Sequence, residues 1–439
     1  MTRLRVLIVG AGIAGNALAY WLAKQQHIVT VIEAHHCLRV NGLQLDLRGH
    51  GIAVMKLMGL EEAVRAKCVP EEGMGLVDST GKKRGFFPAN RSGKGAQTVT
   101  SEFEIMRGDL CQILADAAEL EGAKYQFSTG IEGHMEKGGV VEVRLTDGST
   151  QEVDLLVGCD GNGSKVRRLM FGGGSLPCGT QDPALVVLPE KIAYFTMKEQ
   201  MQKEERFEAW GCAFPGPDKR SMLIRRHKTD QIQVYLFVKE APGADGPLRK
   251  LKRGDVQAEK AAFIEKFRGC GWRADDAVRA LETGAEDFYC QHTGVVKLDS
   301  WSRGHVTLVG DAGYGCPPDG FGTSMAMVGA YVLGGEINRA YRNIGGDDTS
   351  SEVGDRDILS DALRAYEDTF GPCMKSILKG YSGEPGIFDK IPWTPFTISL
   401  ACNAFSIASY LRLDKLAMRF MPGEKGDWKL PDYSDLGRS

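Results

Sequence analysis

Three glycines and one glutamate near the start of the chain have the types and spacing of a dinucleotide site. Gly10, Gly12 and Gly15 form a G-x-G-x-x-G pattern, and Glu33 follows 18 residues after the last glycine. Glycine at these positions permits a tight turn, a close approach of the backbone to a pyrophosphate, and close packing of a helix on a strand. The carboxylate of Glu33 can accept hydrogen bonds from both hydroxyls of an adenosine ribose. The pattern predicts binding of an adenosine diphosphate group, and it does not distinguish NAD from FAD.

Two further carboxylates follow short apolar runs later in the chain. Asp160 comes after residues 155–157, and Asp311 comes after residues 306–309. Both runs are predicted strands, so each carboxylate falls at the carboxyl end of a strand, where open α/β sheets bind their ligands. These positions predict that the two carboxylates belong to the same site as the glycine-rich loop.

The segment after Asp311 adds the start of a predicted helix at Gly322 and Thr323. The free N–H groups and the positive dipole end of that helix are expected to face the sheet. A flavin needs both features, because its ribityl hydroxyls can bind a carboxylate. Its pyrimidine edge becomes anionic on reduction, and helix N–H groups stabilise that charge. We therefore expect noncovalently bound FAD.

The order of these motifs resembles the aromatic-hydroxylase class of flavoprotein monooxygenases. Residues 39–60 and 310–337 look closest to the branch that contains the tetracycline-modifying monooxygenases and related fungal and bacterial enzymes. The resemblance implies that Arg107 lies beside the ribityl chain and the pyrophosphate. The full set of cofactor-binding residues that it implies is Gly10, Gly12, Gly15, Glu33, Arg39, Gly42, Arg107, Asp160, Asp311, Gly322 and Thr323.

The resemblance also implies a reaction. NADH or NADPH would reduce the FAD, and O2 would form a flavin C4a-hydroperoxide that hydroxylates or epoxidises an aromatic or polycyclic small molecule. We assign no catalytic acid or base, because the flavin itself carries this chemistry. Three alternatives remain open: a flavin-dependent oxidase or dehydrogenase, a flavin-dependent halogenase, and a non-catalytic binding protein on the flavin fold. The chain lacks the WxWxIP-type stretch of halogenases.

The spacing of the motifs predicts how the domains are arranged. We expect an α/β fold in which a Rossmann-like FAD-binding domain contains residues 1–71, 100–180 and 283–375. Residues 72–99 and 181–282 would form an inserted, sheet-rich substrate domain, because "KIAYFTM", "SMLIRR" and "IQVYLFV" alternate as strands do. Residues 376–439 would form a C-terminal helical segment.

Alternation marks the strands of the insertion without showing which face lines a pocket. The candidate substrate contacts are Phe195, Trp210, Met222, Arg225 and Tyr235.

Composition excludes several classes of protein. The net charge of −3 over 439 residues provides no basic field for nucleic acid. The 11 cysteines are scattered and no motif predicts a metal site, which favours a reducing, cytoplasmic location. Residues 393–411 carry no charge, but Pro395 and Asn403 interrupt them, so we expect a partly buried C-terminal helix without membrane contact. The sequence leaves the oligomeric state open.

Overall fold

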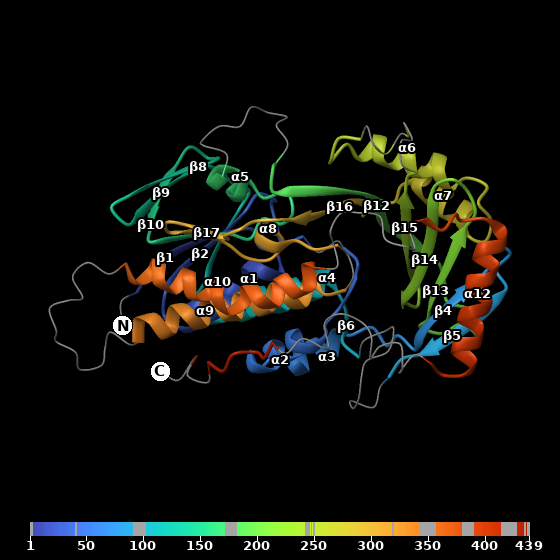
Figure 1. Cartoon of the computed structure of the whole chain (residues 1–439), viewed down its shortest axis with the longest axis horizontal. Helices are drawn as coiled ribbons and strands as arrows, with labels where there is room; N and C mark the ends of the chain where they lie inside the picture. Colours follow the sequence, from blue (N-terminus) through green and yellow to red (C-terminus); the bar gives the residue numbers. More distant parts are fainter. Residues whose placement is uncertain are drawn as a thin grey trace.

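The structure is a computed structural model, and its description covers most of the chain. The described residues are 3–39, 42–90, 102–171, 182–241, 246, 248, 251–317, 320–342, 357–379, 390–413, 428–433 and 436. They form an elongated molecule with one large sheet in each half (Figure 1).

The first sheet has six strands in the order β17-β18-β11-β1-β2-β7. All of its neighbouring strands are parallel except β17 and β18. The strands are β1 (Arg5–Val9), β2 (Ile28–Glu33), β7 (Lys124–Phe127), β11 (Leu155–Gly158), β17 (Ser302–Arg303) and β18 (Val306–Leu308). Because parallel strands end at the same edge of a sheet, the motifs that follow β1, β2, β11 and β18 meet there.

Helices bury this sheet. Residues 13–23 are all buried, because α1 (Ile13–Lys24) is apolar around almost its whole circumference. It packs against α4 (Arg107–Leu120) and α9 (Gly322–Arg342), and α9 packs against α10 (Ile358–Leu378). The shorter helices here are α2 (Gly49–Leu57), α3 (Glu61–Lys67), α5 (Lys165–Phe171) and α8 (Asp311–Tyr314). Two small sheets complete this half: β3 (Gln44–Asp46) with β6 (Glu104–Met106), and β8 (Ile131–Lys137) with β9 (Val140–Leu145) and β10 (Thr150–Val153).

The second large sheet has seven strands in the order β16-β12-β15-β14-β13-β4-β5. The strands are β4 (Gly73–Val77), β5 (Lys83–Pro88), β12 (Leu185–Lys198), β13 (Ala209–Phe214), β14 (Lys219–Lys228), β15 (Gln231–Lys239) and β16 (Tyr289–Val296). It thus joins the two segments that the sequence assigned to the insertion, and it continues past residue 282 because β16 pairs with β12.

The two faces of the second sheet have different partners. Helices α6 (Val256–Phe267) and α7 (Ala274–Thr283) cover one face, where Phe263 and Phe267 pack onto the strands. The opposite face carries Tyr194 and Tyr235, and Leu43 from the cofactor half packs against them. Helix α12 (Pro395–Tyr410) packs against β4, β5 and β13 at the far end of the molecule (Figure 1). Among the described residues, no helix has the length and apolar character needed to cross a membrane.

A buried cluster of charges joins the two halves. The guanidinium of Arg225, on β14, lies 2.8 Å from Glu71 and 2.9 Å from Glu104, on β6. Gln44 donates from its amide nitrogen to both carboxylates, at 3.1 Å and 3.0 Å. The side chains of Glu71 and Glu104 are each 1% exposed, so these bonds replace water almost completely.

Burial raises the pKa of Glu104 well above its usual value, and this effect exceeds the opposing charge of Arg225. The folded protein therefore holds a proton on Glu104 over a pH range that starts near the unfolded value of about 4.3. In that range the folded state binds more protons than the unfolded state. The contribution of this proton to the free energy of unfolding is complete at pH values below the unfolded pKa of Glu104. It is lost as the pH rises through the raised pKa of the folded state.

Glu104→Gln should reduce this loss, because glutamine has the same shape and no charge at any pH. We expect the free energy of unfolding of the variant to fall less steeply above pH 4.5 than that of the parent, by up to about 1.4 kcal/mol per pH unit. Urea titrations across the acidic and neutral range measure this slope. Glu132→Gln, at a half-exposed glutamate, is the control and should keep the parent slope. Identical slopes for the parent and Glu104→Gln would show that Glu104 is ionised throughout.

Candidate functional site

The glycine-rich loop has the conformation that its sequence predicts. Gly10 has φ of 106°, and a Cβ at this position would lie 2.6 Å from the carbonyl oxygen of Cys159. A Cβ at Gly15 would lie 2.0 Å from the carbonyl oxygen of Gly10. A larger residue at Gly10 would therefore push this loop away from the segment after β11, and one at Gly15 would separate α1 from the end of β1.

Gly12 differs from these two glycines, because the space around it is open. The nearest atom to a Cβ at Gly12 would be the Nη2 of Arg107, at 3.9 Å. Gly12 is also the N-cap of α1, and no side chain from the described residues caps that helix. Free N–H groups at a helix end with a guanidinium beside them are the features that the predicted pyrophosphate site requires.

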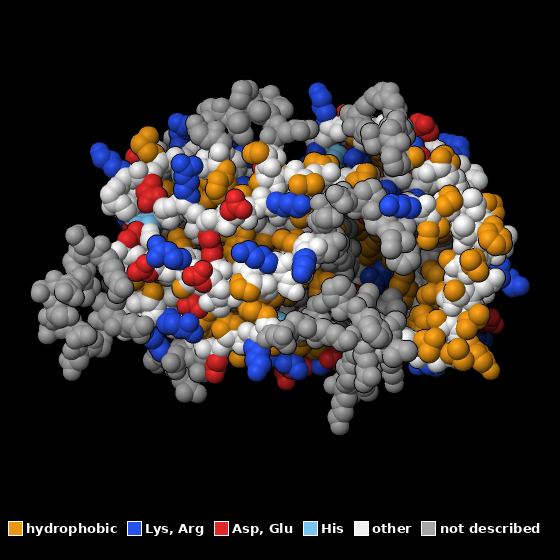
Figure 2. Space-filling model, viewed as in Figure 1, with side chains coloured by type: hydrophobic (Ala, Val, Ile, Leu, Met, Phe, Trp, Pro, Cys, Tyr) orange, Lys and Arg blue, Asp and Glu red, His pale blue; other side chains and the backbone are white. Residues whose placement is uncertain are grey.

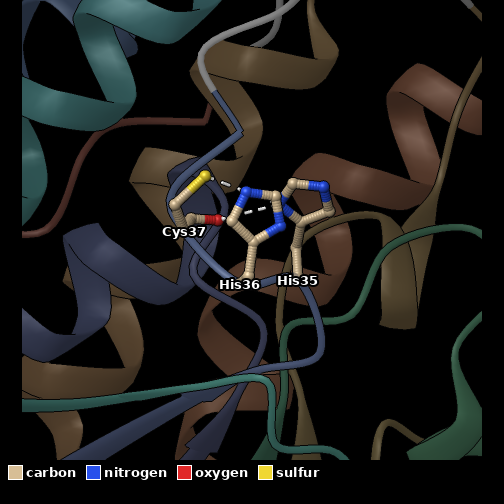
Figure 3. Close-up of side chains that lie close together, drawn as sticks. All are labelled: His35, His36 and Cys37. Carbon is tan, nitrogen blue, oxygen red and sulfur yellow. Dashed lines mark hydrogen bonds between the residues drawn. The ribbon is translucent and has the colours of Figure 1, made fainter.

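Glu33 lies beside this loop at the end of β2. Its Oε2 accepts a hydrogen bond from the backbone of Ala11 at 3.1 Å, and its Oε1 accepts one from the backbone of His35 at 3.0 Å. Figure 3 shows the exposed turn that follows, where the His35 and His36 rings lie side by side and the thiol of Cys37 is 3.6 Å from Nδ1 of His35. Glu33 is thus held beside the glycine-rich turn, and its contact with an adenosine ribose stays a prediction.

Arg107 lies between two predicted cofactor segments. It begins α4, and its backbone N–H donates to the carbonyl oxygen of Leu43 at 3.0 Å. Its side chain passes Gly42, where a Cβ would lie only 3.0 Å from Cδ of Arg107. The glycine at position 42, with φ of 151°, therefore leaves room for the arginine to reach Gly12.

Asp311 is accessible to solvent although protein surrounds it. The loss of surrounding water raises the pKa of Asp311, and the positive charges of Arg107 and Arg167 oppose this rise. A Cβ at Gly322 would lie 4.0 Å from Oδ1 of Asp311, so the start of α9, with Thr323 in its first turn, adjoins the carboxylate. An accessible carboxylate beside a helix N-terminus fits the ribityl chain and pyrimidine edge of a flavin.

Asp160 follows the carboxyl end of β11, as the sequence predicts, and its side chain contacts the start of α5. Its carboxylate accepts hydrogen bonds from the hydroxyl of Ser164 at 2.5 Å and from the backbone N–H groups of Lys165 at 2.7 Å and Val166 at 3.2 Å. Burial raises the pKa of this carboxylate, and these hydrogen bonds oppose the rise. Its backbone lies against Gly10. The side chain therefore caps α5, and we propose that Asp160 positions the glycine-rich loop without a direct contact to the cofactor.

Arg39 is exposed, in the segment that leads to Gly42. Burial raises the pKa of the Cys111 thiol, and the charges of Arg107 and Arg39 both oppose this rise. Arg39 is thus near enough to the cofactor half of the site to influence it electrostatically.

The candidate substrate contacts separate into three groups. Phe195 and Met222 are 3% and 1% exposed and lie in the core beneath α6 and α7, which argues against a substrate contact for either. Trp210 lies near the edge of the sheet, with its ring 5.5 Å from that of Phe86 and its N–H donating to Glu208. Phe195 and Met222 therefore stabilise the insertion, and the substrate contact of half-buried Trp210 stays a prediction. Sequence alternation was correct for the strands and did not show which face the helices cover.

Arg225 and Tyr235 lie on the opposite face, toward the cofactor half. The guanidinium of Arg225 is held in the charge cluster described above. The hydroxyl of Tyr235 accepts from the backbone of Gln44 at 3.1 Å and donates to Gln233 at 2.8 Å. Gln233 in turn donates to the carbonyl oxygen of Gly42 at 3.4 Å. These two residues attach the sheet to the segment beside Arg107.

A cavity of about 480 Å³ lies on this same face, between the sheet and α12. Phe237 lines it and also packs with Tyr194 and Tyr235. The wall on the helix side was missed by the sequence analysis, since nothing local to α12 shows which strands it covers. That wall consists of Ile391, Trp393, Thr397, Ile398, Ala401 and Cys402.

This fold and this site define a flavoprotein with an FAD-binding α/β domain, and comparisons with known proteins agree. Residues 3–174 match the family described as FAD binding domain. The chain is 39% identical over 440 residues to FAD-dependent monooxygenase asL4 of Sarocladium schorii, covering 99% of each protein. It is 39% identical over 358 residues to flavin-dependent monooxygenase eupH of Phoma sp, covering 79% of this chain and 80% of the relative.

Solved structures show the same fold. Tetracycline destructase Tet(55) superimposes with a TM-score of 0.71 at 25% identity over 98% of this chain and 99% of that one. Tetracycline destructase Tet(51) gives 0.72 at 24% identity over 98% and 100%. The chain therefore belongs to the FAD-dependent monooxygenases, and it is an oxidoreductase.

Asp311→Ala should weaken FAD binding about 10- to 100-fold, because one charge-assisted hydrogen bond contributes about 1.5–3 kcal/mol. Titration of apoprotein with FAD, followed by flavin fluorescence, measures the change. Asp361→Ala, at a carboxylate on the exposed side of α10, should bind FAD as the parent does. Equal affinity for the parent and Asp311→Ala would exclude a contact between Asp311 and the cofactor.

Arg107→Ala should also lower FAD affinity, by about tenfold or more, since it removes the guanidinium beside Gly12. Arg107→Lys should restore part of the affinity, because lysine keeps the charge and loses the forked geometry. The matched control is Arg144→Ala, at an exposed arginine on β9. If Arg107→Ala and Arg144→Ala release FAD to the same extent, Arg107 is a surface charge without a role in binding.

Proposed function

We propose that the protein uses NADH or NADPH and O2 to insert one oxygen atom into an aromatic or polycyclic small molecule. The balanced reaction is NAD(P)H + H⁺ + O2 + R–H giving NAD(P)⁺ + H2O + R–OH, or an epoxide where an olefin replaces R–H. When bound, FAD supplies the reduction of oxygen and its transfer. The residues of this chain bind the cofactor, orient the substrate and exclude water.

The observation that carries the proposal is the cavity on the cofactor-facing side of the second sheet. A volume of about 480 Å³ is within the range of small-molecule sites, about 300–1,000 Å³. Most of its lining is apolar, including Leu76, Phe237 and Ile398. Phe237 and Tyr235 continue the same face to Gly42, beside Arg107. A substrate in this cavity would thus lie along the sheet that leads to the cofactor.

The lining indicates the kind of substrate. Its aromatic and aliphatic side chains suit a flat hydrophobic body, and Ser221 and Thr397 supply hydroxyls for a few polar substituents. The similarity to Tet(55) supports a polycyclic compound, because that protein is a tetracycline destructase and tetracycline is polycyclic. A cytoplasmic location is part of the proposal, and the free state of all described cysteines supports it.

An oxidase or dehydrogenase could share the FAD site and would leave no oxygen atom from O2 in its product. The decisive experiment is turnover under ¹⁸O2 in ordinary water, with a substrate first found by screening NADPH and NADH consumption over phenolic and polycyclic compounds. We expect one ¹⁸O atom per product molecule and one NAD(P)H oxidised per product.

The other outcomes identify the alternatives. Unlabelled product with stoichiometric hydrogen peroxide would show an oxidase, and a control in H2¹⁸O excludes exchange. Product formation that requires chloride or bromide would show a halogenase. FAD that is bound but never reduced by either nicotinamide, in the presence of every compound screened, would support a binding protein.

A further inference from the structure

Helix α12 exposes an apolar face that nothing in the described structure covers. Cys402 is its only buried residue. Phe396 is 75% exposed, Leu400 and Ile407 are each 59% exposed, and Tyr410 is 88% exposed. Figure 2 shows hydrophobic side chains gathered along this helix, at the end of the molecule far from the N-terminus. The opposite side of α12 lines the cavity, so the helix separates the cavity from a second apolar surface.

The exposed residues follow the spacing of a helix-pairing seam. Phe396, Leu400, Asn403, Ile407 and Tyr410 succeed one another at intervals of four, three, four and three residues. This alternation places a residue of every turn on one side of a helix, as the a and d positions of a coiled coil do. The order is also symmetric, since an aromatic and an aliphatic residue stand on each side of a central asparagine. The intervals reverse to three, four, three and four, so two antiparallel copies are complementary when the a-type positions of one face the d-type positions of the other.

We propose that the exposed face of α12 pairs with the same face of α12 in a second copy of this chain, in antiparallel orientation about a two-fold axis near Asn403. Leu400 of each copy packs against Asn403 of the other near the centre, and Phe396 of each copy packs against Ile407 of the other. Antiparallel helix dipoles attract, which favours this orientation over the parallel one.

The residues beside the seam suit close pairing. Ser399 and Ala404 flank it and are small, so the two helix axes can approach to about 8–10 Å. Residues 393–411 carry no charge, so the pairing buries none. Two such faces would remove on the order of 1,000 Å² from water, which is close to the lower limit for a specific interface.

Asn403 favours a second copy over a lipid surface. At the centre of the seam, each asparagine can hydrogen-bond to its counterpart, as single polar residues do within coiled coils. Against lipid hydrocarbon the same amide would have no partner, at a cost of about 2 kcal/mol or more. The helix, at 16 residues, is also about 24 Å long and shorter than a bilayer core.

Cross-linking tests the proposal and its orientation. In an antiparallel pair the two residues at 403 lie about 5 Å apart along the axis, whereas the two residues at 396 lie about 16 Å apart. We therefore expect Asn403→Cys to form a covalent dimer with a short bismaleimide, and Phe396→Cys to form none. Both variants are made in a Cys37→Ser background, because Cys37 is the exposed cysteine among those described. After treatment with the same bismaleimide, the background protein and Leu120→Cys should both run as monomers on a denaturing gel. Leu120 lies on α4 and is 89% exposed.

Sedimentation over a range of concentrations provides a second measurement. We expect the parent to form dimers. The double variant, which combines Leu400→Glu with Ile407→Glu, should form none, and the control Leu120→Glu should form dimers as the parent does. FAD content should be equal in all three proteins, because every substituted side chain is exposed. A parent that remains a monomer at all concentrations, or dimers that persist in the double variant, would overturn the proposal. Cross-linking at both 403 and 396 would overturn the antiparallel orientation.

Vesicles distinguish the alternative partner. If the parent sediments with phosphatidylcholine–phosphatidylglycerol vesicles, the double variant does not, and Asn403→Cys gives no covalent dimer, the face binds lipid and the proposal is wrong.

Discussion

Parallel pairing of β1 with β2 and β11 is the constraint on which the site depends. The register places Val9 beside Ile32 and Gly158, so three loops leave the sheet at the same level. Such a convergence is possible only if the backbones of the loops can touch, and Gly10 provides the contact with Cys159 that any Cβ would prevent. The uncapped end of α1 and the carboxylate of Glu33 then face the same space. The dinucleotide site is thus a consequence of strand order and one left-handed glycine.

The buried charges around Arg225 fix the position of the second sheet, as the close contact at Gly10 fixes the loop beside the first sheet. The insertion meets the cofactor half through β3 and β6, which are three residues each and offer few backbone bonds. Arg225 and Gln44 therefore hold the carboxylates of Glu71 and Glu104 across this junction. A buried cluster of this kind adds little stability compared with an apolar one, yet it tolerates few alternative arrangements. It fixes the position of the sheet face that carries Tyr235, and with it the distance between cavity and cofactor.

The sequence predicted the parts of the protein that depend on local chemistry. Gly10 and Gly15 are each required by backbone that lies a few residues away or beside the next strand, and the structure places them as expected. Phe195 and Met222 show the limit of this reasoning. Their alternation identified strands correctly, but their direction depends on α6 and α7, which follow much later in the chain. Asp160 shows another limit, because its motif predicts a site residue and cannot show that α5 occupies the carboxylate.

Helix α12 links the substrate cavity to the outer surface of the molecule. One side of it forms the cavity wall through Trp393, Thr397 and Ile398, and the other side is apolar and exposed. Few hydrogen bonds outside the helix hold it, one being between Ser409 and the backbone of Phe86. Apolar contacts hold it as well, since Phe405 packs edge-on against Phe87 and Cys402 is buried, and movement of α12 against these contacts would open the cavity to solvent. A partner on its outer face would oppose that movement, because the apolar contacts would have to be broken as the wall opens. If a second copy occupies the outer face and the cavity holds the substrate, as proposed, the two would be coupled through a single helix.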